Sequence, residues 1–292
     1  MIRAVVLALF GLCLLAGPAA ARPGVDATFD AQGVTVLEDG APVFFYRTKS
    51  ANPDTAPGRL NYIHPLYAPD GVVLTEDAPA DHPSQRGVYW AWDRILLDGK
   101  AEANSSELQG LTYFVRSTRF EGQDDGSAFL IVTTDWIDRA KDELTFLATE
   151  VTRIHVFPTK DKTRRLELET TITSKVDGLA LAASADPSQH GGLTLRLIDP
   201  TSLTFTSDGA AVKPTPGPVK TGDSVGFGWT ASGPAWGLTV SCKADDVALN
   251  HWVLRNTTSA QNCVFPTGGP RTLAKDSSLK LSTTLIIAPK AP

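Results

Sequence analysis

The sequence predicts an all-β protein built as a single large antiparallel β-sandwich. Past the first 21 residues, hardly any stretch shows the apolar period of about 3.6 residues that is typical of a helix. Short alternating, β-branched or aromatic runs follow one another instead, with Gly, Pro, Asp and Asn between them. These runs do not alternate with helical segments, which argues against a parallel βαβ fold.

The first elements form a predicted hairpin. Residues 34–37 and 43–46 are β-branched or aromatic, and Glu38, Asp39 and Gly40 between them are typical turn residues. Runs of the same kind predict further strands at 111–116, 128–136, 147–157, 165–173, 193–198, 203–206, 225–229, 236–242, 251–255 and 279–287. This spacing suits a sandwich, and a supersandwich of the galactose-mutarotase type is one form it could take.

The first 21 residues predict an export signal. Arg3 supplies a positive charge, residues 4–16 are almost entirely apolar, and three alanines at 19–21 fit the small residues that a signal peptidase recognises. Because the apolar run is shorter than the roughly 20 residues that cross a bilayer, we expect cleavage after Ala21 and no membrane span. A lipoprotein anchor at Cys13 is the less favoured alternative. The mature chain is therefore expected in the periplasm or outside the cell.

Residues 22–292 are predicted to form one domain. About 270 residues suffice for a single large β domain. The Pro-rich segment 214–218 predicts an extended surface loop, because the composition is the same on both sides of it. The net charge of -5 is spread without blocks, so we expect no nucleic-acid partner and no anionic membrane partner.

Two cysteines, Cys242 and Cys263, remain once the signal is removed. In an exported protein this pair predicts a disulfide, which would close a loop of about 20 residues and contribute roughly 3 kcal/mol. Two buried free thiols are the alternative. The sequence has no CxxC or Cys/His zinc spacing, no phosphate-binding glycine loop and no GxSxG serine elbow. We therefore predict neither a metal nor a cofactor.

One stretch, 62–92, departs from the pattern of strands and short turns. Its first part is rich in Pro, Gly and Asp and contains two of the five histidines, His64 and His82. Trp90 and Trp92 follow at once. Long loops on a rigid β scaffold are frequent positions for binding and catalytic groups. We therefore predict a functional site around this long loop.

The same stretch resembles the PmoA-like family of exported bacterial proteins. Residues 64–87 are similar to that family's "FHPLY.P.G..v" and "ADHPHHRG" segments, and 191–196 and 252–255 are similar to its "GGL.FR" and "PWHVR" segments. The family's usual setting among sugar-degrading proteins implies a carbohydrate role. A methane oxygenase function does not fit, because such membrane subunits have several spans. The chain departs from the pattern at Ser84-Gln85, where the family has two histidines, and this favours altered chemistry or simple binding.

The histidines of this stretch are the candidate catalytic residues. We expect His82, together with His64, to transfer protons, with Asp81 orienting the imidazole. A metal site that also includes His190 is less favoured, because no HExxH or HxH spacing supports it. Histidines that only hydrogen-bond the backbone of a Pro-rich loop are the structural alternative.

Predicted substrate contacts come from polar side chains and aromatic rings. They are Asp81, Gln85, Arg86, Trp90, His190, Arg196, Trp252 and Arg255. Guanidinium groups offer planar forked donors to anions and hydroxyls, and flat rings stack on sugars. As structural alternatives, Arg196 could form a buried ion pair with Glu150, and the two tryptophans could belong to the core.

The expected function is the binding or processing of a carbohydrate or sugar derivative, a small molecule or an oligosaccharide, in a polar and aromatic cleft. A non-catalytic sugar-binding module is the second hypothesis, and a structural or partner-binding envelope protein is the third. The sequence leaves the oligomeric state open. Convergence of His64, His82, Arg86, His190 and Arg255 on one pocket would favour the first two hypotheses over the third.

Overall fold

A computed structural model describes residues 24–50, 58–138, 145–230 and 233–290. Over these ranges the chain forms 23 β-strands and one short 3-10 turn, Pro200–Ser202, so the all-β prediction is confirmed. No helix in the described residues is long and apolar enough to cross a membrane. The predicted signal peptide lies outside the described residues.

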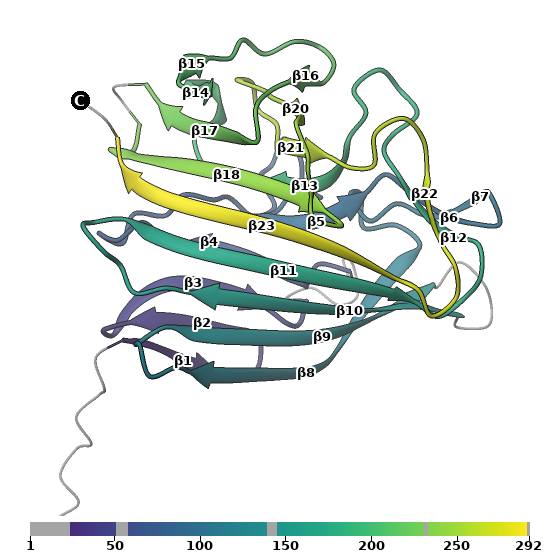
Figure 1. Ribbon diagram of the computed structural model, residues 1–292, viewed down its shortest axis with the longest axis horizontal. Helices are drawn as coiled ribbons and strands as arrows, with labels where there is room; N and C mark the ends of the chain where they lie inside the picture. Colours follow the sequence, from purple (N-terminus) through teal and green to yellow (C-terminus); the bar gives the residue numbers. More distant parts are fainter. Residues whose placement is uncertain (1–23, 51–57, 139–144, 231–232, 291–292) are drawn as a thin grey trace, which may run out of the picture.

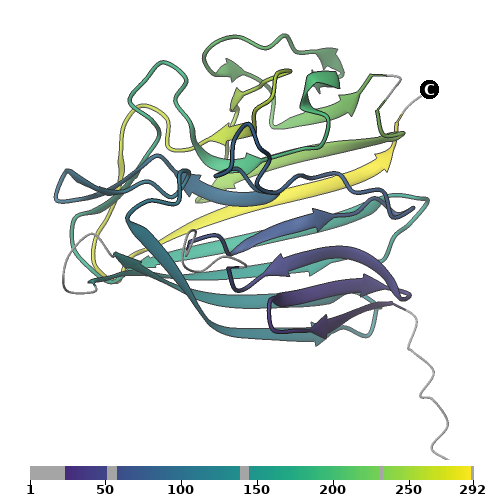
Figure 2. The same ribbon diagram turned by 180° about the vertical axis from the view of Figure 1, so that it is seen from behind.

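Two large antiparallel sheets pack face to face as a sandwich (Figures 1 and 2). The nine-stranded sheet has the order β1 (Val25–Phe29), β2 (Gly33–Glu38), β3 (Ala41–Arg47), β4 (Tyr62–Leu66), β5 (Val88–Trp92), β13 (Gly191–Leu195), β21 (Gln261–Val264), β20 (His251–Val253), β16 (Val219–Lys220). The ten-stranded sheet has the order β15 (Ala210–Ala211), β14 (Leu203–Ser207), β17 (Ser224–Trp229), β18 (Trp236–Ala244), β23 (Ser278–Pro289), β11 (Arg164–Ser174), β10 (Thr145–Val156), β9 (Ala128–Asp138), β8 (Leu111–Gly122), with β19 (Val247–Ala248) beside β18. A four-stranded sheet at one end of the sandwich has the order β22 (Arg271–Leu273), β12 (Leu179–Ala182), β6 (Arg94–Leu97), β7 (Lys100–Ala103).

Alternating side chains explain the long strands of the ten-stranded sheet. Along β11, Leu166, Leu168 and Ile172 are buried, whereas Arg165 and Glu167 point away from the core. This is the period of two that a half-buried strand requires. The sheet therefore has one apolar face and one polar face.

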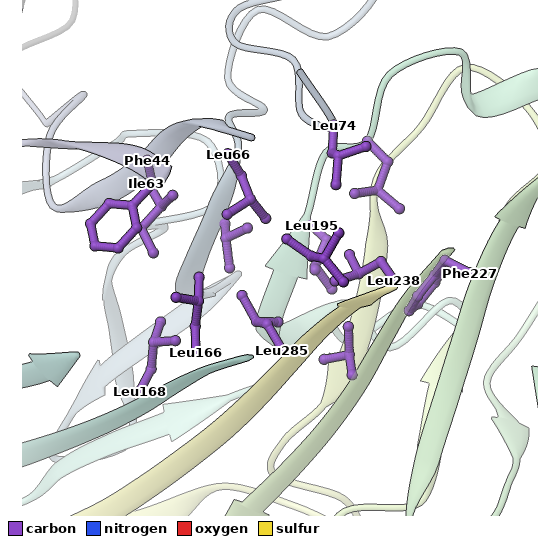
Figure 3. Close-up of a cluster of buried hydrophobic side chains, with 14 of the residues drawn as sticks. Phe44, Ile63, Leu66, Leu74, Leu166, Leu168, Leu195, Phe227, Leu238 and Leu285 are labelled. Atoms are coloured by element: carbon purple, nitrogen blue, oxygen red, sulfur yellow. The ribbon is translucent and has the colours of Figure 1, made fainter. Parts of the chain in front are cut away.

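The apolar faces of the two sheets meet in the main core (Figure 3). Phe44 and Leu66 project from the nine-stranded sheet toward Leu166, Leu285 and Phe227 of the ten-stranded sheet. All five are essentially inaccessible to solvent, and burying such a side chain contributes about 1.5–3 kcal/mol. This packing fixes the strands on which the candidate site is built.

The sequence was correct about the long strands and wrong about the stretch 62–92. The predicted hairpin is formed by β2 and β3, which pair antiparallel with one register shift between Val36 and Leu37. In contrast, both ends of the supposed loop are strands, because β4 and β5 belong to the nine-stranded sheet. The loop proper covers residues 67–87.

Cys242 and Cys263 lie opposite each other between the sheets. Cys242 is on β18 and Cys263 is on β21, both are fully buried, and both are free thiols, so the predicted disulfide is not formed in the structure. Burial, followed by a hydrogen bond with Cys242, raises the pKa of the Cys263 thiol well above its usual value. The thiol therefore stays protonated and packs as a small apolar group.

Candidate functional site

Three neighbouring strands present a row of polar side chains on the outer face of the nine-stranded sheet. Tyr89 of β5 is in register with Thr194 of β13, and Thr194 is in register with Asn262 of β21. Their neighbours Leu193 and Cys263 are in the core, so strand alternation directs the row away from the core. This row lines a cavity of about 240 Å³.

Loops from distant parts of the chain complete this cavity, which we call the His82–His190 pocket. Its other lining residues are His82, Ser84, Gln85, Asp93, Ser106, Glu107, His190, Ser259 and Ala260. The volume lies below the range of about 300–1,000 Å³ that is typical of small-molecule pockets. The pocket therefore suits a compact polar ligand.

Asn262 is held in place by three hydrogen bonds. Its side-chain oxygen accepts from the backbone N–H of Gly191 at 3.0 Å. Its Nδ2 donates to the carbonyl of Leu193 at 3.0 Å and to Oγ1 of Thr194 at 3.1 Å. The amide therefore has a fixed orientation, which makes this part of the pocket preorganised.

Arg196 anchors the loop that carries His82. Its buried guanidinium donates through Nε to Glu76 at 2.8 Å, through Nη1 to Oε1 of Gln85 at 2.9 Å, and through Nη2 to both oxygens of Asp81 at 3.2 Å. The carboxylate partners, Glu76 and Asp81, belong to the loop 67–87. The sequence alone does not show that this loop lies beside β13. The alternative partner considered for this arginine, Glu150, is wrong.

Glu150 lies between the two sheets instead. It accepts hydrogen bonds from Asn61 at 2.9 Å, from the indole of Trp136 at 2.8 Å and from Thr152 at 2.9 Å. Burial raises the pKa of Glu150, and these three bonds oppose the rise. Its role is structural.

Asp81 orients His82, as the sequence predicted. Nδ1 of His82 lies 3.0 Å from Oδ2 of Asp81. The hydrogen bond with His82, supported by Arg196, lowers the pKa of Asp81 to about 2, so Asp81 is an ionised acceptor. A neutral His82 ring then carries its proton on Nδ1 and its free lone pair on Nε2.

Asp93 and His190 face the same pocket and have opposite pKa shifts. Burial raises the pKa of Asp93, against a hydrogen bond from Ser106. Burial lowers the pKa of His190, against the charge of Asp93. Both groups are therefore biased toward their uncharged forms. The sequence predicted His190 but not Asp93, Glu107 or Asn262. Of these three, only Asp93 had a signal in the sequence, since it is a charged residue directly after the aromatic strand that ends at Trp92.

Two further predicted residues lie outside the pocket. His64 does not line it, and its Nδ1 lies 3.0 Å from Oγ1 of Thr75, so the expected pair of His64 and His82 is not brought together. Arg86 is buried, and its guanidinium lies 3.8 Å from the ring centre of Tyr89. Because Arg86 donates to the carbonyls of Ser84 and Ser105, it supports the pocket instead of contacting a ligand.

Arg255 holds the Pro-rich loop. Its guanidinium donates to the carbonyls of Thr215 at 2.9 Å and Pro216 at 2.8 Å. Residues 214–218 do form a loop, between β15 and β16, as the sequence predicted. Arg255 is therefore not a lining residue, although its charge acts on His190.

The tryptophans predicted to stack on sugars belong to the core. Trp252 is fully buried and packs edge-on against Phe227, with ring centres 5.7 Å apart. Trp90 packs against the hydrophobic core and stacks on Trp92 at 6.2 Å. Because odd-numbered positions of β5 face outward, Tyr89 supplies the aromatic surface of the pocket.

Two larger hollows in the described part of the chain are weaker candidates for a binding site. One of about 370 Å³ on the outer face of the ten-stranded sheet includes Glu167 and Glu169, whose carboxylates pair with Arg165 and Lys280. Another, of about 480 Å³, follows the loop 183–189 and includes glycines and prolines. No three His, Cys, Asp or Glu side chains in the described ranges are placed to hold a metal ion.

The fold and the site define an all-β sandwich protein with a small polar pocket on the outer face of its nine-stranded sheet. Residues 33–292 match a protein family described as a family of unknown function, DUF6807, and the chain belongs to this family. A search of curated proteins finds no significant match. The family match carries no link to the PmoA-like family, so that resemblance stays a prediction.

Proposed function

We propose that this protein binds a carbohydrate or sugar derivative in the His82–His190 pocket. The observation that supports this is the mixture of donors and acceptors around one cavity of about 240 Å³. Imidazoles, carboxylates, amides and hydroxyls from five segments of the chain converge there. A sugar hydroxyl both donates and accepts hydrogen bonds, so it needs such a mixture.

His82 and Gln85 are the ligand contacts that the loop supplies. Nε2 of His82 can accept a hydrogen bond from a sugar hydroxyl, because Asp81 accepts the proton on Nδ1. The amide of Gln85 bridges Arg196 and Ser259, at 2.9 and 3.4 Å, and keeps one N–H for a ligand. Arg196 thus positions Gln85 directly and His82 through Asp81.

Processing of the bound sugar is favoured by Asp93 and His190. A carboxyl group with a raised pKa can donate a proton, and an imidazole with a lowered pKa can accept one. The two groups share one pocket, which is the arrangement that general acid–base catalysis needs. Binding is the basic function in this proposal, and proton transfer to or from the bound sugar is its enzymatic form.

Thermal unfolding of residues 22–292 with a panel of neutral monosaccharides, amino sugars and sugar acids tests the proposal. A ligand present at about 100 times its Kd should stabilise the protein by about 2.7 kcal/mol. We expect one class of sugar to raise the Tm, and His82→Ala to remove most of that rise. His155→Ala is the matched control, because His155 lies on β10 of the other sheet and lines the hollow there. If no sugar changes the Tm, the proposal is wrong.

A further inference from the structure

The arginines around the pocket are already bonded to the protein. Arg196 is bonded to Glu76, Asp81 and Gln85, and its side chain is only 2 % exposed. Arg86 and Arg255 donate to backbone carbonyls. None of the three lines the cavity. A ligand in the pocket therefore meets no free guanidinium group.

The acidic residues of the pocket differ from these arginines, because they line the cavity and are not bonded to a charged partner in the described part of the chain. Asp93 and Glu107 both line the cavity, and neither forms an ion pair with another residue in the described part of the chain. Asp186 lies close enough to act electrostatically on Asp93. Burial keeps His190 toward its neutral form, so this imidazole does not offset the acidic groups. Burial, with the charges of Glu107 and Asp186, also raises the pKa of Asp93, so its ionised form lacks a compensating charge in the protein. A cation beside Asp93 would favour that ionised form.

We propose that the pocket selects a saccharide that carries an amino group, with Asp93 and Glu107 facing the ammonium group of the ligand. This inference rests on the binding form of the proposed carbohydrate function and specifies the charge of the ligand. A partly buried carboxylate lacks the solvation that water would supply, and a bound cation replaces that solvation. A uronic acid would place a further negative charge beside these acidic groups, and like charges in such a site disfavour binding.

Titration calorimetry of residues 22–292 at pH 7 distinguishes the ligand classes. The probes are glucosamine, glucose and glucuronate, with galactosamine, galactose and galacturonate as a second series. The amino group of these sugars resembles an α-amino group, with a pKa near about 7.7–8.0, and is mostly charged at pH 7. In at least one series we expect the amino sugar to bind about tenfold tighter than the neutral sugar, and the acid to bind more weakly than both.

Charge-neutral variants test which carboxylates bind the ammonium group of the ligand. Asp93→Asn and Glu107→Gln should each reduce the preference for the amino sugar over the neutral sugar, taken as the ratio of the two affinities of the same variant, to about threefold or less. Glu107 is exposed at the rim, so its variant tests the inference even if Asp93→Asn fails to fold. Glu169→Gln is the matched control, since Glu169 lies on β11 of the ten-stranded sheet.

The outcomes separate this inference from the function on which it rests. Equal affinity for amino and neutral sugars, or a preference that survives in both variants, overturns the charge selection and leaves carbohydrate binding intact. Tighter binding of the uronic acid also overturns it. If neither neutral nor amino sugars bind, the proposed function fails, and the inference fails with it.

Discussion

At the scale of single residues, Arg196 determines the geometry of the loop that carries His82. Three of its nitrogens are bonded to three different side chains of the segment 76–85. Lysine has one flexible point charge in place of a planar fork and cannot make these bonds together. We expect Arg196→Lys to lower the free energy of unfolding by about 1.5–3 kcal/mol, the range for hydrogen bonds to charged groups. Urea unfolding measures this loss, and sugar affinity should fall in parallel.

Arg119→Lys is the control for that experiment. Arg119 is 68 % exposed and pairs with Glu121 on the same strand, so its replacement should change stability by no more than about 0.5 kcal/mol. Equal effects of the two substitutions would show that Arg196 does not anchor the loop.

His190 provides a pH-dependent prediction for a single residue. Because burial lowers its pKa in the folded protein, the folded state prefers the neutral ring. Protonation then favours the unfolded state, so His190 reduces stability as the pH falls from about 6.5 toward its folded pKa and has no effect above that window. Proton NMR of the imidazole Hε1 should show a midpoint below 6.5. A midpoint at or above 6.5 would contradict the burial of this ring.

At the scale of the strands, the close approach of β4 and β5 depends on Gly87. A Cβ atom at this position would lie 1.9 Å from the carbonyl oxygen of Ile63 and 2.8 Å from Cβ of His64. Gly87→Ala therefore forces the end of the loop away from β4, and overpacking of this kind costs about 1–3 kcal/mol. We expect a lower unfolding midpoint in urea and weaker sugar binding.

Gly122→Ala is the matched control for Gly87→Ala. Nothing lies within 4 Å of a Cβ atom built at Gly122. Its replacement should leave both the unfolding midpoint and the affinity nearly unchanged. A Gly87→Ala protein as stable as this control would show that the two strands are not held so closely.

The strands also show which parts of the fold can be predicted from sequence. Segment 164–174 was predictable because its alternation is nearly perfect, and its buried face needs only one partner surface. Strand β4 was missed because Pro65 and His64 interrupt its apolar pattern. The pocket row was missed for a different reason. Tyr89, Thr194 and Asn262 meet only through the register of three strands that are far apart in the chain, and one sequence contains no signal for that register.

At the scale of the whole molecule, the sandwich encloses the two cysteines. Cys242 and Cys263 come from different sheets and are both inaccessible to solvent. For a chain that begins after residue 21, a thiol reagent should label neither cysteine in the native protein and both after unfolding without reductant. Labelling of neither cysteine after unfolding would show that a disulfide has formed.

The same enclosed core makes stability depend on pH through Glu150. Burial raises the pKa of Glu150, so the folded state prefers the protonated acid. Its contribution to stability is therefore present below the unfolded pKa, near about 4.3, and is lost as the pH rises through the folded pKa. Glu150→Gln keeps the shape and removes the titration. The quantity to compare is the free energy of unfolding of the unmodified protein minus that of Glu150→Gln. We expect this difference to be smaller at pH 8 than at pH 5, and urea unfolding of both proteins at both pH values measures it. A difference that is larger at pH 8 would mean that the hydrogen bonds from Asn61, Trp136 and Thr152 stabilise the ionised carboxylate more than burial destabilises it.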